Sequence, residues 1–369
     1  MKLAFVLFKY FPFGGLQRDM VRIAEACRQR GHEIHVFTLS WEGERPPGFH
    51  VHVLPIRRLT NHSRYGAFHV QLKGYFDKLG IDRVIGFNKL PGLDFYFAAD
   101  PCLRDKLMRE RSALTRLLPR YRHFLAWESA VFGRASKTRI LLISPRQEKI
   151  HRSYYGTQTE RLFMLSPGIQ KDRMAGPDAS ELRSGLRREF GIGEEEKLVL
   201  CIGSGFRTKG LDRSLKALAA LPEPLRSKTR LIAIGSDNAA PFLRLARKLG
   251  VEARFQVLKG RDDIPRFLQG GDLLLHPAYN ENSGMVILEA IVAGLPVLVT
   301  GVCGYAFYVD RADAGRVIPE PFSQELFDRY LAEMLESPER EQWRENGVRF
   351  GQREDLYSMA HRAADIILS

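Results

Sequence analysis

Short apolar runs alternate with amphipathic stretches along the first half of the chain. The first apolar run, Leu3–Phe8, is followed by an amphipathic stretch from about residue 17 to residue 30 and by a second run, Ile34–Leu39. Runs of this length are typical of buried strands, whereas an apolar residue at every third or fourth position is typical of helices. Two later runs, Arg83–Phe87 and Arg139–Ile143, fit the same scheme. The alternation predicts βαβ units and a parallel sheet.

A segment rich in proline and glycine, Ser166–Pro177, interrupts the pattern, which then restarts. The strands expected after it are Leu198–Ile202, Leu231–Ile234, Phe255–Leu258, Leu273–His276 and Val297–Thr300. Because single hydrophobic cores stop growing at roughly 250–300 residues, a chain of 369 residues should form two domains. We expect two doubly wound α/β domains, residues 1–168 and 169–350.

The last segment, residues 351–369, is expected to form a separate helix. Its apolar side chains lie on one helical face between Glu354 and Leu368, and a face of this kind must pack against another element. We expect this helix to cross back and pack on the first domain.

The chain is strongly basic, with a net charge of +13 and a pI near 9.7. Phosphorylated small molecules, nucleic acid and an anionic membrane surface are therefore the candidate partners. The four cysteines lack paired metal-ligand spacing, which favours a reduced, cytosolic compartment. No apolar run approaches the roughly 20 residues that a membrane span needs, so we expect any membrane contact to be peripheral.

Glycine-rich turns follow the first strand of each predicted domain. The pair Gly14 and Gly15 lies at a strand-to-helix turn, where the backbone can approach a ligand closely, although a tight turn alone would also explain it. The turn of the second domain adds two cations, Arg207 and Lys209. A diphosphate could be held there by these groups and by a helix N-terminus, but exposed cations are also common in loops.

The most specific pattern follows the strand that ends at His276. It places Glu281 before a predicted helix, with Ser283 as the expected N-cap, and Glu289 inside that helix. The backbone N–H groups that would be free to bind phosphate oxygens are those of Ser283, Gly284, Met285 and Val286. Eight helical residues rise about 12 Å, the scale of a nucleotide sugar from ribose to hexose. Glu289 could therefore bind ribose hydroxyls and Glu281 the sugar.

The alternative is that both glutamates are ordinary surface residues. Glu289, however, lies in the apolar stretch Met285–Leu295, where an unpartnered carboxylate would be costly. The sequence contains no Asp-x-Asp pair, so we predict no metal site and expect cations and helix N-termini to neutralise the diphosphate.

These motifs together resemble the family 4 retaining glycosyltransferases of the GT-B fold, and within them the lipopolysaccharide core glucosyltransferases that add glucose to inner-core heptose. The stretches that carry the resemblance are Lys9–Asp19, Ser40–Gly43, Gly86–Asp94, Tyr96–Asp100, Leu273–Tyr279 and Glu320–Glu325. The resemblance implies two Rossmann-like domains facing a cleft, with a UDP-sugar held mainly by the second domain and the lipid-linked acceptor by the first. It also implies retaining, metal-independent transfer of glucose from UDP-glucose without a cofactor, the alternative being a UDP-amino sugar or another acceptor.

The resemblance also assigns roles to single residues. The expected catalytic residues are Asp100 on the acceptor side, Lys209 and Glu281. The expected donor-binding residues are Gly14, Gly15, Asp19, Arg173, Arg207, Lys209, Arg261, Glu281, Ser283, Gly284, Met285, Val286 and Glu289, with Arg261 against the uracil. One departure from the family pattern is Thr208, which separates Arg207 from Lys209 and leaves the role of the arginine open.

Retention of configuration needs either a covalent carboxylate intermediate or attack from the leaving-group face. No carboxylate is plainly placed as a nucleophile. Our hypothesis is front-face attack, in which the departing β-phosphate takes the acceptor proton and Lys209 stabilises the developing negative charge.

The segment from residue 102 to residue 132 mixes cations with apolar residues, the composition of an interfacial amphipathic helix. The expected membrane-contact residues are Arg104, Lys106, Arg109, Arg111, Arg116, Arg120 and Arg122. A core helix with a solvated basic face would have the same composition. With the resemblance, the segment predicts a cytoplasmic protein that lies on the inner face of the bacterial inner membrane.

Three other classes compete with this interpretation. A nucleic-acid-binding protein would explain the charge but not the two glutamates. Another enzyme of the GT-B fold, such as an epimerase or phosphorylase, is a second alternative, and an epimerase would turn over a UDP-sugar without an acceptor. A Rossmann oxidoreductase is disfavoured because the first glycine loop lacks the G-x-G-x-x-G spacing.

Overall fold

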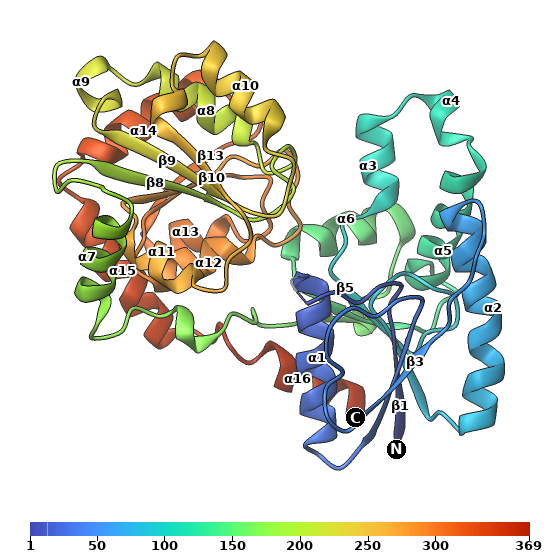
Figure 1. Cartoon of the computed structure of the whole chain (residues 1–369). Coiled ribbons are helices and arrows are strands. Elements are labelled where there is room, and N and C mark those ends of the chain that lie inside the picture. Colours follow the sequence, from blue (N-terminus) through green and yellow to red (C-terminus); the bar gives the residue numbers. More distant parts are fainter. Residues whose placement is uncertain (13) are drawn as a thin grey trace. The chain divides into compact units, whose positions relative to one another are not determined.

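The computed structural model describes residues 1–12 and 14–369 and shows an α/β chain of two compact units (Figure 1). The first unit comprises Met1–Gly168 together with Ser358–Ser369, and the second comprises Ile169–Tyr357. Each unit is built on one parallel sheet. The expected α/β class and doubly wound organisation are therefore confirmed.

The first unit contains a seven-stranded sheet in the order β3-β2-β1-β4-β5-β6-β7. Its strands are β1 Lys2–Val6, β2 Glu33–Thr38, β3 Phe49–Val53, β4 Arg83–Gly86, β5 Phe95–Ala98, β6 Arg139–Leu142 and β7 Leu162–Met164. Its helices are α1 Gly15–Arg28, α2 Asn61–Leu79, α3 Leu103–Glu110, α4 Ala113–Arg116, α5 Pro119–Phe132, α6 Pro145–Tyr155 and α16 Met359–Leu368, with a 3-10 turn at Thr159–Arg161.

Strand β1 shows why helices cover both faces of this sheet. Leu3 and Phe5 lie in a core that includes residues of α1 and α16, whereas Ala4 and Val6 lie in a second core with residues of α2 and α5. Because alternate side chains of a strand point to opposite faces, a strand buried on both sides reads as a continuous apolar run.

Helix α16 packs against α1 in the first unit. Ala363 and Ile367 of α16 are buried in the same core as Ile23 of α1. The division between the units differs from the expected boundary at residue 350, because residues 351–357 belong to the second unit. Leu356 is buried in the core of that unit, and its carbonyl oxygen accepts a hydrogen bond of 3.1 Å from the N–H of Ile169.

The second unit contains a six-stranded sheet in the order β10-β9-β8-β11-β12-β13. Its strands are β8 Lys197–Ile202, β9 Thr229–Ile234, β10 Phe255–Leu258, β11 Leu273–His276, β12 Val297–Thr300 and β13 Gly315–Ile318. Its helices are α7 Ala179–Glu189, α8 Leu211–Ala220, α9 Glu223–Arg226, α10 Ala240–Lys248, α11 Ile264–Gly270, α12 Met285–Val292, α13 Phe307–Ala312, α14 Gln324–Glu336 and α15 Arg340–Arg353, with 3-10 turns at Lys171–Arg173 and Glu252–Arg254. The strand order reverses between β8 and β11, and ligands of such sheets bind beyond the carboxyl ends of the strands at this point.

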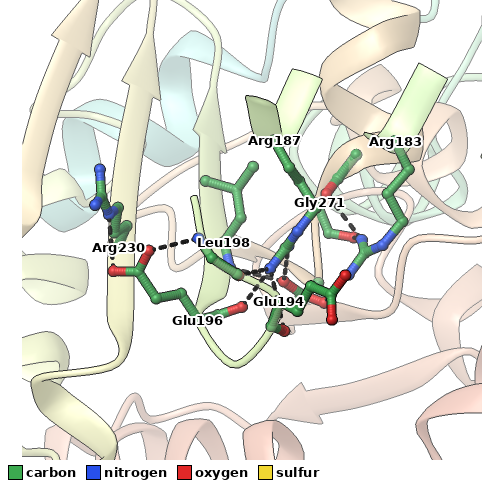
Figure 2. Close-up of polar contacts among 10 residues, drawn as sticks. Arg183, Arg187, Glu194, Glu196, Leu198, Arg230 and Gly271 are labelled. Atoms are coloured by element: carbon green, nitrogen blue, oxygen red, sulfur yellow. Dashed lines mark hydrogen bonds and ion pairs between the residues drawn. The ribbon is translucent and has the colours of Figure 1, made fainter. Parts of the chain in front are cut away.

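A network of ion pairs lies at the amino edge of this second sheet, opposite the carboxyl ends of its strands (Figure 2). Arg183 and Arg187 of α7 bind the two carboxylate oxygens of Asp272 at 2.7 and 3.2 Å. Asp272 precedes β11 and also accepts a hydrogen bond of 2.7 Å from the N–H of Leu198 in β8. The three cationic and amide donors hold the pKa of the largely buried Asp272 below its ordinary value, although burial alone would raise it.

Candidate active site

Two adjacent strands place the site at the carboxyl edge of the second sheet. The loop after β8 carries Lys209, the loop after β11 carries Glu281, and the Lys209 ammonium donates to Oε2 of Glu281. Gly210 permits this close approach of the loops, since its φ is +75° and a Cβ there would lie 2.0 Å from the carbonyl oxygen of Pro277. The two loops are also joined by a hydrogen bond of 2.8 Å from the N–H of Tyr279 to the carbonyl of Thr208.

Glu281 is ionised because two basic groups flank it. Burial alone would raise its pKa, but the buried ring of His276, with Nε2 3.5 Å from Oε2, and the charge of Lys209 lower that pKa to about 2. Burial in turn lowers the pKa of His276, so the imidazole is neutral at pH 7. The site therefore holds one carboxylate and one ammonium group beside a neutral imidazole.

Helix α12 begins one residue later than expected. Its N-cap is Gly284, with φ +84°, and not Ser283, and no side chain caps the helix. The N–H groups of Gly284, Met285 and Val286 have no hydrogen-bond partner among residues 1–12 and 14–369. These free donors and the helix dipole favour an anion at this helix terminus.

A second pair of charges lies against the same helix. Arg173, in the 3-10 turn Lys171–Arg173, is buried, and its Nε lies 3.8 Å from Oε1 of Glu289. Its Nη2 donates a hydrogen bond of 3.4 Å to Gln170, whereas Nε and Nη1 are buried without a hydrogen-bond partner in the described part of the chain. A guanidinium with two unsatisfied buried donors is suited to bind an acceptor-rich ligand.

Two expected donor-binding cations lie apart from these pairs. Arg207 is exposed, and its side chain makes no hydrogen bond or ion pair with the residues that the structure describes. Arg261 forms a bidentate ion pair with Asp263, at 2.6 and 2.8 Å, and its guanidinium lies 5.1 Å from the ring centroid of Phe267. A planar ligand would therefore meet Arg261 in an orientation fixed by Asp263.

The expected residues of the first unit lie at the carboxyl edge of its own sheet. Gly14 is the N-cap of α1, Gly15 is its first residue, and Asp19 is half-buried in the second turn. A Cβ at Gly14 would lie 1.8 Å from Oε1 of Gln17, whereas one at Gly15 would meet no atom within 4 Å. Asp100 is exposed two residues after β5.

The basic segment is not a single amphipathic helix, as expected, but three helices, α3, α4 and α5 (Figure 1). Ser112 caps α4, and Pro119 starts α5, so the chain turns twice within the segment. Most of the expected membrane-contact cations are exposed, namely Arg104, Lys106, Arg109, Arg111, Arg120 and Arg122, while Arg116 is half-buried and donates to the Met108 sulfur. Leu114 and Leu117 beside them are 80% and 68% exposed.

Sequence reasoning missed two groups of polar residues. His276 ends an apolar strand immediately before the Glu281 motif, and a histidine in that place was an available signal. Glu128 lies in the apolar stretch Phe124–Phe132 and is fully buried, where it pairs with Lys89. The position of Glu128 in an apolar stretch repeats the pattern that drew attention to Glu289.

One group within the described residues could hold a metal ion, and it lies in the first unit. It consists of Cys102, Glu128 and His151, all buried, with ligand atoms within 4.8 Å of one another. The carboxylate of Glu128 already accepts from the Lys89 ammonium at 2.5 Å and from the Tyr155 hydroxyl at 2.6 Å. The positive charge that a metal would supply is thus provided by Lys89.

Comparison with known proteins gives full-length matches. A family model described as Glycosyltransferase Family 4 matches residues 13–173, and one described as Glycosyl transferases group 1 matches residues 183–350. The lipopolysaccharide glucosyltransferase WaaG of Escherichia coli K12 is 46% identical over 368 residues, which cover 100% of this chain and 98% of WaaG. The crystal structure of WaaG, a glycosyltransferase involved in lipopolysaccharide biosynthesis, matches with a TM-score of 0.94 over 99% of both chains.

A more distant protein shares the fold alone. The Anabaena protein Alr3699/HepE, solved in complex with UDP-glucose, is 18% identical and matches with a TM-score of 0.76 over 100% of this chain and 99% of its own. None of the helices that the structure describes is long and apolar enough to cross a membrane. From its two Rossmann-like units and its full-length match to WaaG, the chain belongs to the same glycosyltransferase family as WaaG, and it is a glycosyltransferase of the GT-B fold.

Proposed function

We propose that this enzyme transfers glucose from UDP-glucose to a heptose of the lipopolysaccharide inner core, with retention of configuration and without a metal ion. The similarity to WaaG, a lipopolysaccharide glucosyltransferase, supports the reaction and the acceptor class. The complex of Alr3699/HepE with UDP-glucose supports a UDP-sugar donor through the shared fold.

The observation that carries the proposal is the arrangement of charges around the start of α12. Lys209 pairs with Glu281 just before the helix, Arg173 lies beside Glu289 within it, and the free N–H groups of residues 284–286 lie at its N-terminus. A diphosphate needs cations and N–H donors, and a sugar and a ribose need carboxylate acceptors. The site provides both in one unit.

The proposed mechanism assigns a task to each group. The Lys209 ammonium and the α12 N–H groups bind the diphosphate and stabilise the charge that develops on the β-phosphate as the glycosidic bond breaks. Glu281, ionised at pH 7, accepts hydrogen bonds from donor sugar hydroxyls, and Glu289 accepts from the ribose. The acceptor hydroxyl attacks from the leaving-group face, and its proton passes to the departing phosphate.

The same charges support metal independence. A UDP diphosphate carries about two negative charges, and two cations with a helix N-terminus can offset them locally. The sequence has no Asp-x-Asp pair to hold a divalent ion there. We include Gly14, Gly15 and Asp19 of the first unit, and Arg207 and Arg261 of the second, as further donor-binding residues in this proposal.

We also propose that the enzyme acts at the inner face of the bacterial inner membrane, bound through α3, α4 and α5. The exposed leucines of α4 and the segment after it lie among exposed arginines, the combination that an anionic lipid surface attracts. Each cation near such a surface contributes about 1 kcal/mol.

The test is UDP release from UDP-glucose with heptose-containing, truncated lipopolysaccharide as acceptor, in parallel with UDP-galactose and UDP-N-acetylhexosamines. We expect acceptor-dependent release with UDP-glucose that persists in EDTA and is lost in Glu281→Ala. A product of inverted configuration would contradict the retaining mechanism, and loss in EDTA would contradict metal independence. Faster UDP release from a UDP-N-acetylhexosamine than from UDP-glucose would identify an amino sugar, and not glucose, as the sugar transferred.

A further inference from the structure

A buried ion pair in the first unit lies next to the loop that carries Asp100. The side chain of Glu128 in α5 is 0% exposed and that of Lys89 is 12% exposed, and the Lys89 ammonium lies 2.5 Å from Oε1 of Glu128. Burial alone would raise the pKa of Glu128, but the charge of Lys89 and hydrogen bonds from Tyr155 and Leu103 lower that pKa to about 2. The Glu128 carboxylate is therefore ionised at pH 7 although it is removed from water.

Both members of the pair also bind the backbone that follows β5. The Lys89 ammonium donates a second hydrogen bond of 3.0 Å to the carbonyl of Pro101. The Glu128 carboxylate accepts from the N–H of Leu103 at 2.7 Å and from the N–H of Arg104 at 3.0 Å. One ion pair thus holds the chain directly after Asp100 at three residues, Pro101, Leu103 and Arg104.

Asp100 depends on this backbone for its position. Its exposed carboxylate has no hydrogen-bond or ion-pair partner in the part of the chain that the structure describes, so no side-chain contact fixes it. The two N–H groups bound by Glu128 are the first two of α3, the helix at the start of the basic segment. Movement of Pro101 or of the start of α3 would therefore move Asp100.

We propose that Lys89 and Glu128 are positioning residues that hold the loop of Asp100, an exposed carboxylate at the carboxyl edge of the first sheet, in place for the glycosyl acceptor, an inference that rests on the proposed function. Stability alone explains such a pair poorly, because the desolvation of two charges offsets much of their attraction. The pair instead fixes the position of the loop, since an ionised carboxylate and an ammonium bind N–H and carbonyl groups more strongly than neutral side chains do.

The decisive variants are Lys89→Met, which removes the bond to Pro101, Glu128→Gln, which removes the charge at the start of α3, and the double variant. The double variant carries no unpaired buried charge, so it keeps the test valid if a single variant folds poorly. Two controls accompany them. Tyr155→Phe removes a hydrogen bond of 2.6 Å to the same carboxylate but no bond to the loop, and Asp272→Asn breaks the ion pairs of Asp272 with Arg183 and Arg187 in the second unit.

The measurement is UDP release from the full chain at varied UDP-glucose and at varied truncated lipopolysaccharide, with melting temperatures recorded in parallel. We expect Lys89→Met, Glu128→Gln and the double variant to raise the KM for acceptor or lower acceptor-dependent kcat by about 10- to 100-fold. The KM for donor should change by less than about threefold, since the charged donor-binding pairs, Lys209 with Glu281 and Arg173 with Glu289, lie in the second unit. Both controls should lower the melting temperature without this change.

Two results would contradict the reasoning in different places. If the variants lose melting temperature as Asp272→Asn does but keep wild-type acceptor constants, the pair is structural only and the positioning role is refuted. If the unchanged enzyme shows no acceptor-dependent release with any donor, the proposed function fails and the positioning role fails with it.

Discussion

Removal of the Lys209 ammonium tests the site most directly. In Lys209→Met the Glu281 carboxylate loses its ion-pair partner, while the neutral ring of His276 stays beside it, with Nε2 3.5 Å from Oε2. The lost charge-assisted hydrogen bond should lower the free energy of unfolding by about 1.5–3 kcal/mol at pH 7. It should also raise the pKa of Glu281 from about 2, because burial then dominates.

The effect on turnover should be larger than the effect on stability. If Lys209 stabilises the departing diphosphate, its loss should lower kcat at saturating donor by about 10²- to 10³-fold, the usual effect of removing one preorganised donor to a developing oxyanion. The double variant Lys209→Met/Glu281→Gln should recover most of the stability, because no unpaired charge is left, but none of the turnover.

The assay is acceptor-dependent UDP release at saturating UDP-glucose, with urea unfolding of each variant. Lys216→Met is the matched control, since Lys216 is an exposed lysine of the neighbouring helix α8 whose nearest carboxylate, that of Asp212, is 4.0 Å away. That control should keep turnover and stability close to wild type. Turnover within about threefold of wild type in Lys209→Met would refute the assigned role of the lysine.

The pKa of Glu281 is lowered from the ordinary 4.5 to about 2, so its ionisation contributes about 3 kcal/mol of stability above pH 4.5, and this is lost as the pH falls toward 2. Urea unfolding between pH 4.5 and pH 2 should therefore show a larger loss of stability in wild type than in Lys209→Met/Glu281→Gln. The same pH dependence of unfolding free energy in both proteins would contradict this prediction. Arg173→Met should raise the KM for UDP-glucose about tenfold or more with little change in the KM for acceptor, measured by UDP release; an unchanged donor KM would exclude contact with the donor. Leu114→Ser/Leu117→Ser should weaken cosedimentation with anionic vesicles but leave binding to zwitterionic vesicles and the melting temperature unchanged. If the variant and wild type bind anionic vesicles equally, these leucines do not contact the membrane.

The fold was largely predictable from the sequence because parallel strands covered on both faces are apolar along their whole length. The strands Phe255–Leu258, Leu273–His276 and Val297–Thr300 have the expected bounds. Strand β3, Phe49–Val53, was missed because it lies at the edge of its sheet and alternates histidine with apolar residues. Strand β13, Gly315–Ile318, is short and contains an arginine, so it has no apolar run to recognise.

The sequence by itself determined which residues are chemically able to form the site. The order of strand, glycine turn and helix places Lys209 and Glu281 in loops at the carboxyl ends of strands, because consecutive parallel strands share that edge. The apolar neighbours of Glu289 indicated a buried carboxylate that needs a partner, and the structure brings Arg173 to within 3.8 Å of it. Local spacing was sufficient for these inferences.

Only the tertiary structure decided how these residues pair. The contact of Lys209 with Glu281 joins residues 72 positions apart, and that of Lys89 with Glu128 joins residues 39 apart, distances at which spacing carries no information. The start of α12 at Met285 depends on the positive φ of Gly284, and the division of residues 103–132 into three helices depends on Ser112 and Pro119. Such features arise because a buried charge must find its partner in space, and folding selects that partner from residues the chain brings together, not from those adjacent in sequence.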